Sequence, residues 1–168
     1  YPNRAPYPPE TFDRLAGLID RAVAPVRVLD AGCGTGQMTS GLLPHVDEID
    51  AVDISAAMIG AGRRMPYGAD PRINWITGPI EEVELRPPYA LIVAAASLHW
   101  MPWAVTLPRF ARMLAANGYL ALVENRPTRQ PWADELRPLL AHYSMNQDFQ
   151  PYDMNTVAAT LAKQGLFQ

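Results

Sequence analysis

The stretch from Asp30 to Gly36 has the residue types and spacing of a ligand-binding loop. Gly32, Gly34 and Gly36 alternate with other residues directly after a short apolar segment. Glycine permits a positive φ angle in a tight turn, and its lack of a Cβ atom lets a ligand lie against the backbone. A helix is predicted from about Gln37, and the free N–H groups at the start of a helix favour an electron-rich or negatively charged ligand. The loop therefore predicts a binding site.

Asp53 indicates which kind of ligand this loop would hold. It ends a second apolar segment about 20 residues beyond the first glycine, where an acidic residue suits the two hydroxyls of a ribose. The glycine spacing differs from the dinucleotide pattern Gly-x-Gly-x-x-Gly, and Asp30 precedes the first glycine. A carboxylate there would repel a diphosphate and attract an amino group. A nucleoside with an ammonium group and no phosphate fits this combination, and S-adenosylmethionine (SAM) is such a molecule.

The sequence resembles the class I SAM-dependent methyltransferases at both places. Residues 28–36, Val-Leu-Asp-Ala-Gly-Cys-Gly-Thr-Gly, resemble the first motif of that family, and Asp53-Ile54-Ser55 followed by Met58 resembles the second. The resemblance runs from about Tyr1 to Asn125 and is to the subgroup that acts on small molecules. It implies SAM as the cofactor and S-adenosylhomocysteine (SAH) as the product. The cofactor-binding residues that we infer are Asp30, Gly32, Gly34, Gly36, Asp53, Ile54, Met58, Pro79, Ile80, Glu81 and Ala95.

Residues 78–81, Gly-Pro-Ile-Glu, depart from the family pattern at one position. Members often carry an acidic residue directly after this glycine, where it accepts a hydrogen bond from the adenine amino group. Pro79 stands there in this chain. The contact would therefore come from Glu81 or be absent, while Ile80 would pack on the adenine ring.

A second group of residues is predicted to bind the methyl acceptor. Residues 97–103, Ser-Leu-His-Trp-Met-Pro-Trp, follow the fourth predicted strand, and the carboxyl end of such a strand faces the ligand. The small residues before them, ending at Ala95 and Ala96, leave room for the methionine part of the cofactor. The substrate-binding residues that we expect are Arg4, Tyr7, His99, Trp100 and Trp103.

His99 is the candidate catalytic residue, because a histidine can take a proton near neutral pH. The two indoles of this segment could instead cover the core. Residues 1–9 contain four prolines and cannot be helical, so they form either a lid over the cofactor or a disordered tail.

The elements that would position these residues alternate between strands and helices, which predicts an α/β fold. The resemblance implies a Rossmann-like doubly wound sheet of five parallel strands in the order 3-2-1-4-5, with helices on both faces. The family's last two strands would follow, and the chain ends before them. The predicted strands cover residues 26–29, 49–54, 73–77, 90–96 and 119–124, and the predicted helices cover 10–23, 37–43, 55–65, 104–116, 132–144 and 155–163. Ser55 is a predicted N-cap, and Asn117-Gly118 is predicted to end a helix.

Composition narrows the classes of protein that this chain can represent. Its 168 residues are 49% hydrophobic, which suits a single domain over residues 1–168. The net charge is −3 and no basic run exceeds two residues, so nucleic acid is not an expected partner. No apolar run approaches the roughly 20 residues of a membrane span. The single Cys33 suits the cytoplasm. No metal site is predicted, and the oligomeric state stays open.

The predicted activity is transfer of a methyl group from SAM to a small-molecule acceptor by in-line displacement. The resemblance implies that the acceptor atom is an oxygen, in a carboxylate or a hydroxyl. The cofactor brings its own leaving group, so the protein mainly aligns the reactants. An alternative is a SAM-binding domain without catalysis, either an accessory or a degenerate copy. An NAD-binding protein is disfavoured by the glycine spacing.

Overall fold

The computed structural model describes residues 5–22, 24–124, 132, 135–136, 138–139, 142 and 154–167. The chain divides into two compact units, residues 1–124 and 125–168, and each is described by itself. In the described part of the chain, no helix combines the length and the hydropathy that a membrane crossing requires.

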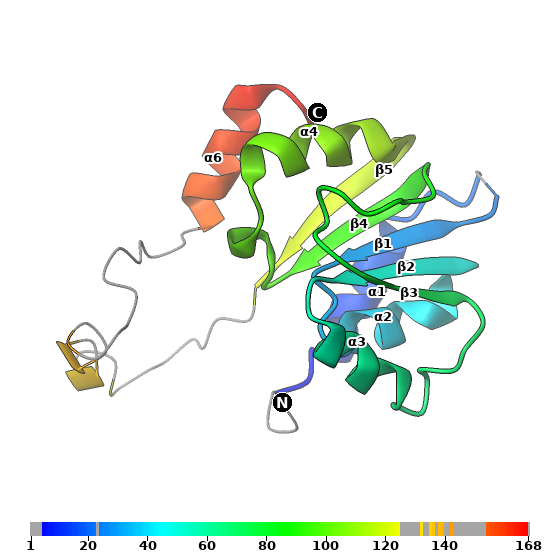
Figure 1. The fold of residues 1–168 in the computed structure, drawn as a ribbon. Coiled ribbons are helices and arrows are strands. Elements are labelled where there is room, and N and C mark those ends of the chain that lie inside the picture. The colour runs from blue at the N-terminus through cyan, green and yellow to red at the C-terminus, as the bar shows by residue number, and fades with distance from the viewer. Residues whose placement is uncertain are drawn as a thin grey trace. The chain divides into compact units, whose positions relative to one another are not determined.

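The first unit contains a five-stranded parallel sheet in the order β3-β2-β1-β4-β5 (Figure 1). The central strands are apolar and buried on both faces, as parallel strands between two helical layers must be. This result confirms the predicted fold class and strand order. The strands are β1 (Arg27–Ala31), β2 (Glu48–Asp53), β3 (Ile73–Thr77), β4 (Tyr89–Ala95) and β5 (Leu114–Val123).

Helices cover the two faces of this sheet. One hydrophobic cluster joins residues of α1 (Pro9–Gly17), α2 (Gln37–Leu42) and α3 (Ala56–Arg63) to one face of the strands. Leu107 and Phe110 of α4 (Trp103–Met113) are fully buried outside that cluster, and α4 lies across the sheet from the other three helices (Figure 1). Short 3-10 turns are η1 (Leu43–His45) and η2 (Leu98–Trp100), and the second unit contains α6 (Met154–Gln164).

The first helix differs from its prediction at both ends. Pro9 is its first residue, so the expectation that residues 1–9 contain no helix is wrong at this position. Proline suits the first helical position because its fixed φ angle is helical and its missing N–H would have no partner there. The helix ends at Gly17 rather than near residue 23. The Asp20 carboxylate accepts a hydrogen bond from the Ala22 N–H at 2.8 Å, and this local turn replaces further helix.

The junction between α4 and β5 also differs from its prediction. The helix ends at Met113 and the strand begins at once at Leu114, so Asn117-Gly118 lies inside the strand and ends no helix. The pairing of β4 with β5 shifts register here, from Tyr89–Leu114 to Leu91–Tyr119. A Cβ atom on Gly118 would lie 2.7 Å from the Tyr89 carbonyl oxygen. Glycine is needed at this bulge for close approach of two backbones.

The remaining boundaries agree closely with the predictions. Strand β3 matches residues 73–77, and α6 covers the helix predicted over 155–163. Ser55 caps α3, because its hydroxyl accepts a hydrogen bond from the Met58 N–H. The helix predicted over 132–144 falls mostly outside the described residues.

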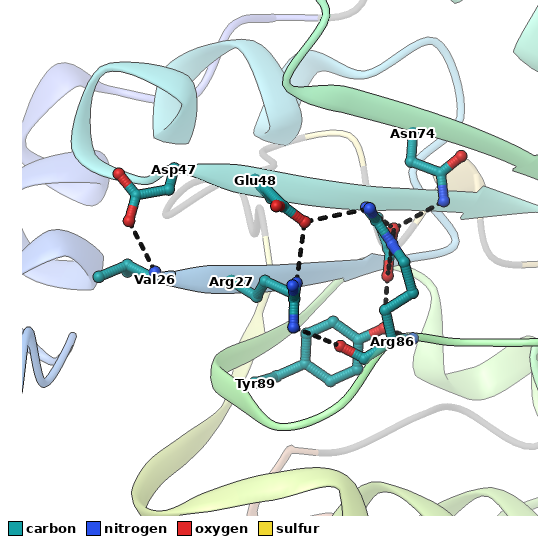
Figure 2. Close-up of polar contacts among 8 residues, drawn as sticks. Val26, Arg27, Asp47, Glu48, Asn74, Arg86 and Tyr89 are labelled. Carbon is teal, nitrogen blue, oxygen red and sulfur yellow. Dashed lines mark hydrogen bonds and ion pairs between the residues drawn. The ribbon is translucent and has the colours of Figure 1, made fainter. Parts of the chain in front are cut away.

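A polar network fixes the amino-terminal ends of the strands, at the edge opposite the glycine loop (Figure 2). Asp50 of β2 has no exposed side-chain area and accepts hydrogen bonds from Arg86, Tyr89 and Asn74. Burial would raise the pKa of Asp50, but these three donors outweigh burial and hold the pKa below its ordinary value. Glu48 pairs with both Arg27 and Arg86, at 2.8 and 3.0 Å. The network thus links β1, β2 and β3 to the segment that enters β4.

Candidate functional site

A cavity of about 420 Å³ lies at the carboxyl ends of the strands, where α/β sheets bind ligands. It is bounded by the glycine loop, the end of β2, the loop after β3 and the loop after β4. The lining residues are Gly32, Gly34, Val52, Asp53, Ile54, Ser55, Met58, Gly78, Pro79, Ile80, Glu81, Ala95, Ala96, Ser97, Trp100 and Met101.

The three glycines of the loop all have positive φ angles, of 75°, 58° and 86° in chain order. Gly32 also permits a close approach, because a Cβ atom there would lie 2.5 Å from the Cβ atom of Ser97. A Cβ atom on Gly36 would lie 2.5 Å from the Trp75 ring. Gly36 does not line the cavity, so its role in this structure is packing. Gly32 and Gly34 leave their backbone open to a ligand.

Asp53 connects the end of β2 to the glycine loop. One of its carboxylate oxygens accepts a hydrogen bond from the Gly34 N–H, and the other accepts one from the Ser55 N–H, both at 2.8 Å. A carboxylate has about four acceptor positions, so the group can still accept two further hydrogen bonds. These backbone contacts hold the carboxylate at the cavity wall, where paired hydroxyls can reach it.

Asp30 lines a second, smaller cavity, which shares Gly32, Gly34 and Ala95 with the first. The side chain is fully buried, and Oδ2 accepts a hydrogen bond from the Thr39 hydroxyl at 2.6 Å. Oδ1 has no hydrogen-bond partner among the described residues. This cavity of about 30 Å³ is lined by Tyr7, Asp30, Gly32, Cys33, Gly34, Thr35, Gln37, Met38 and Ala95.

The environment of Asp30 disfavours its charged form. Burial raises its pKa from 3.8 to about 6, against the opposing effect of the Thr39 hydrogen bond. A buried carboxylate oxygen without a partner is rare in folded proteins, and a cationic group would supply what it lacks. The structure therefore fits an ammonium ligand beside Asp30.

The loop after β3 forms the apolar end of the large cavity. Ile80 is buried at its wall, next to Pro79 and Glu81. Ile54 lines the same cavity, and the residue is 74% exposed. Apolar side chains left exposed in a cavity favour a flat apolar ligand such as a nucleobase.

The loop after β4 bounds the end of the cavity near Ala95. Ala96 has a φ angle of 50°, which is unusual for a residue other than glycine and marks a strained turn. Ser97 is buried and donates a hydrogen bond to the Ala31 carbonyl oxygen at 2.6 Å. Trp100 lines the cavity although the residue is 82% exposed, and Met101 also lines it.

The predicted substrate-binding residues do not all meet at this cavity. Trp100 lines it, whereas Tyr7 is buried at the small Asp30 cavity. His99 is exposed and does not line either cavity, although its ring centroid lies 5.0 Å from that of Trp100. The Trp103 indole N–H donates to the Leu98 carbonyl oxygen at 2.8 Å, so its visible role is to brace the loop. Arg4 lies outside the described residues.

Most of the predicted cofactor-binding residues line one of the two cavities, and Gly36 is the exception. Sequence reasoning missed other members of the walls, namely Val52, Ser55, Gly78, Ala96, Ser97 and Met101 in the large cavity and Cys33, Thr35, Gln37 and Met38 in the small one. Each of them lies within or next to a segment that the sequence had singled out. The available signal was therefore adjacency to a motif, which does not tell which neighbour faces inward.

Two kinds of comparison with known proteins bear on this site. A sequence model described as "Methyltransferase domain" matches residues 28–118, more than half of the chain. An uncharacterized methyltransferase of Mycobacterium tuberculosis is 34% identical over 139 residues, which cover 82% of this chain and 54% of the relative. The chain belongs to the class I SAM-dependent methyltransferase family. This result confirms the predicted family.

Two further comparisons place this methyltransferase domain among its relatives. A trans-aconitate 2-methyltransferase of Methylobacterium nodulans is 37% identical over 102 residues, covering 59% of this chain and 38% of that protein. The crystal structure of the YcgJ protein of Bacillus subtilis has a TM-score of 0.67 at 18% identity, covering 92% of this chain and 67% of that one. The second likeness shows the fold. The methyltransferase chain spans about half the length of the mycobacterial relative, 54%.

Proposed function

We propose that this chain binds SAM across the two cavities and transfers its methyl group to a small-molecule acceptor. The observation that carries the proposal is the pair of carboxylates, one in each of the two cavities that the glycine loop lines. Asp53 would accept hydrogen bonds from the ribose hydroxyls, and the unpartnered oxygen of Asp30 would accept one from the ammonium group. Ile54, Met58 and Ile80 would enclose the adenine ring.

The residues present fit such a ligand in both charge and shape. The ribose and ammonium positions are acidic, and phosphate would be repelled at both. Gly32 and Gly34 line the cavity with backbone alone, which lets a ligand lie against it. When bound, SAM supplies an electrophilic methyl group on a sulfonium sulfur. The protein's own residues would align that group with the acceptor and exclude water from it.

No nucleophile of the protein is required for this reaction. Burial raises the pKa of the Cys33 thiol, and the charges of Asp30 and Asp53 raise it further, so Cys33 stays protonated and is a poor candidate for covalent catalysis. The acceptor itself would be the nucleophile. Trp100 and Met101 are the candidates to contact it, because they line the cavity beside Ala95. His99 would be recruited as a base only through movement of the exposed loop.

Among the possible acceptor atoms, we propose a carboxylate oxygen. Support comes from the relative described as a trans-aconitate 2-methyltransferase, at 37% identity. The competing proposal is a SAM-binding domain that does not catalyse transfer. The cofactor-binding residues are equally consistent with both proposals. We propose the cytoplasm as the compartment, in line with a single cysteine that is buried in the glycine loop.

Turnover of radiolabelled SAM separates these two proposals. The chain is incubated with a panel of small carboxylic acids, hydroxylated aromatics and amines, and label in the organic product is counted. Transfer to a carboxylic acid that is lost in Asp53→Ala supports the enzyme with oxygen specificity. SAM binding by calorimetry without transfer to any panel member supports the binding domain. Absence of SAM binding refutes both.

A further inference from the structure

Arg109, on the second turn of α4, makes contacts that reach outside its own helix. Its guanidinium donates one hydrogen bond to the Glu81 carbonyl oxygen and another to the Val83 carbonyl oxygen. Its Nε atom is buried without a partner among the described residues. An arginine carries its donors in a rigid planar fork, so these two bonds fix both the position and the orientation of the segment that they hold.

That segment, residues 78–83, is the loop that forms the apolar end of the large cavity. Its first residue is tied to β2, because the Gly78 N–H donates to the Asp53 carbonyl oxygen at 3.0 Å. The rest closes into one turn, in which the N–H groups of Glu82 and Val83 donate to the Pro79 carbonyl oxygen at 3.0 and 3.1 Å. Arg109 holds the later part of the turn through the Glu81 and Val83 carbonyl oxygens. Removing the guanidinium would take away the hydrogen bonds to both carbonyl oxygens and so loosen the turn between its two attached ends.

The residues inside this turn are the ones that would meet the adenine ring. Pro79, Ile80 and Glu81 line the cavity, and the carbonyl of Glu81 is itself an Arg109 acceptor. Arg109 does not line the cavity, so it would act on a ligand only through the loop. A small displacement of Ile80 would change the fit of a flat ring, since contact energy falls steeply with a gap of about 0.5–1 Å.

Helix α4 also supports the other end of the same cavity. Its first residue, Trp103, donates its indole N–H to the Leu98 carbonyl oxygen and so braces the loop that carries Trp100. Arg109 lies farther along the same helix and holds the loop that carries Ile80. One helix therefore sets the separation between the adenine end and the acceptor end.

We propose that Arg109 is a positioning residue for cofactor recognition: it fixes residues 79–81 so that they read the adenine base. This role rests on the proposed function, because it assumes that SAM and SAH bind in the large cavity. It goes beyond that function by assigning base selectivity to a residue that touches no ligand.

The test compares SAH with S-inosylhomocysteine, which carries hypoxanthine in place of adenine, by calorimetric titration of the full chain. Arg109→Met keeps the apolar stem and loses the donors. Arg109→Lys keeps the charge but has no fork to span two carbonyls. Arg112→Met, an exposed position on the same helix, is the matched control. Melting curves of all four proteins establish how much of each is folded.

Wild type and Arg112→Met are expected to prefer SAH over S-inosylhomocysteine to the same extent. Arg109→Met is expected to bind SAH about tenfold more weakly and to lose most of that preference, because two charge-assisted bonds are removed. Arg109→Lys should fall between them in both measurements. A folded Arg109→Met or Arg109→Lys protein with wild-type affinity and preference would overturn the proposal and leave Arg109 a stabilising residue only. Failure of the wild type to bind SAH would overturn the proposed function along with it.

Discussion

Replacing Asp30 by asparagine should stabilise the ligand-free protein while weakening its affinity for the cofactor. Burial raises the Asp30 pKa from 3.8 to about 6. The folded protein therefore holds this proton more tightly than the unfolded chain does. The protonated Asp30 carboxyl group therefore contributes to the free energy of unfolding. This contribution is fully present below about pH 4 and is lost as the pH rises through about 6. At pH 7 the loss is about 3 kcal/mol, because each pKa unit corresponds to about 1.4 kcal/mol.

The amide of the Asp30→Asn variant carries no charge to bury, so the difference from wild type should depend on pH. At pH 8 the Asp30→Asn protein should melt roughly 6–12 °C above wild type, since 1 kcal/mol shifts the melting temperature by about 2–4 °C at this chain length. At pH 4.5 the difference should shrink to roughly 2–4 °C, because only about 1 kcal/mol of the loss has developed at that pH. The magnitude is an upper value, because the new amide also needs hydrogen-bond partners in a small cavity.

Thermal melts without ligand at pH 4.5 and pH 8 check this expectation, and Asp13→Asn, an exposed position on α1, is the control. Calorimetry at pH 7 should show SAH binding to Asp30→Asn at least about tenfold more weakly, through loss of a charge-assisted bond. For wild type, SAH affinity should fall below about pH 6 as Asp30 takes up a proton. A variant that is less stable than wild type at pH 8, or equally shifted at both pH values, would show that the buried charge of Asp30 does not destabilise the folded protein.

Three further predictions concern other parts of the molecule. Asp53→Ala should weaken SAH binding at least about tenfold in calorimetry, because a charge-assisted bond contributes about 1.5–3 kcal/mol; a loss below about threefold contradicts the ribose role. Asp50→Ala should lower the free energy of unfolding by about 3 kcal/mol in urea titration and leave SAH affinity unchanged, since it strands Arg86, Tyr89 and Asn74 at the opposite edge of the sheet. A near-neutral effect would contradict the network. Trp100→Ala should raise the KM for the acceptor and spare SAH affinity; an unchanged KM would remove Trp100 from the acceptor site.

The sheet was predictable because its determinants are local. Five apolar segments separated by helical periodicity specify strands, and the two motifs place the ligand at their carboxyl ends. Where the predictions failed, a distant contact overrides a local signal. Asn117-Gly118 reads as the end of a helix, yet Gly118 faces the Tyr89 carbonyl across the sheet. Trp103 reads as a pocket residue, yet its indole N–H has a backbone acceptor.

The residue types of the site could be predicted from the sequence, but the hydrogen bonds that position them could not. Asp30 and Asp53 stand out in the sequence by their spacing from the glycines. The sequence does not show that Thr39 of α2 donates to only one oxygen of Asp30 and that the other oxygen lacks a partner. Arg109 carries no sequence signal at all, since the carbonyl groups that it holds lie 26 and 28 residues earlier in the chain.

In the proposed complex, Asp53 binds the ribose and Asp30 binds the ammonium group of the same cofactor molecule. A crystal structure of the chain with SAH tests this binding mode most directly. We expect the ribose hydroxyls within hydrogen-bond distance of Asp53, the ammonium group against Oδ1 of Asp30, and the adenine ring beside Ile80. SAH bound with its ammonium group away from Asp30, or bound outside these cavities, would rule out the proposed binding mode.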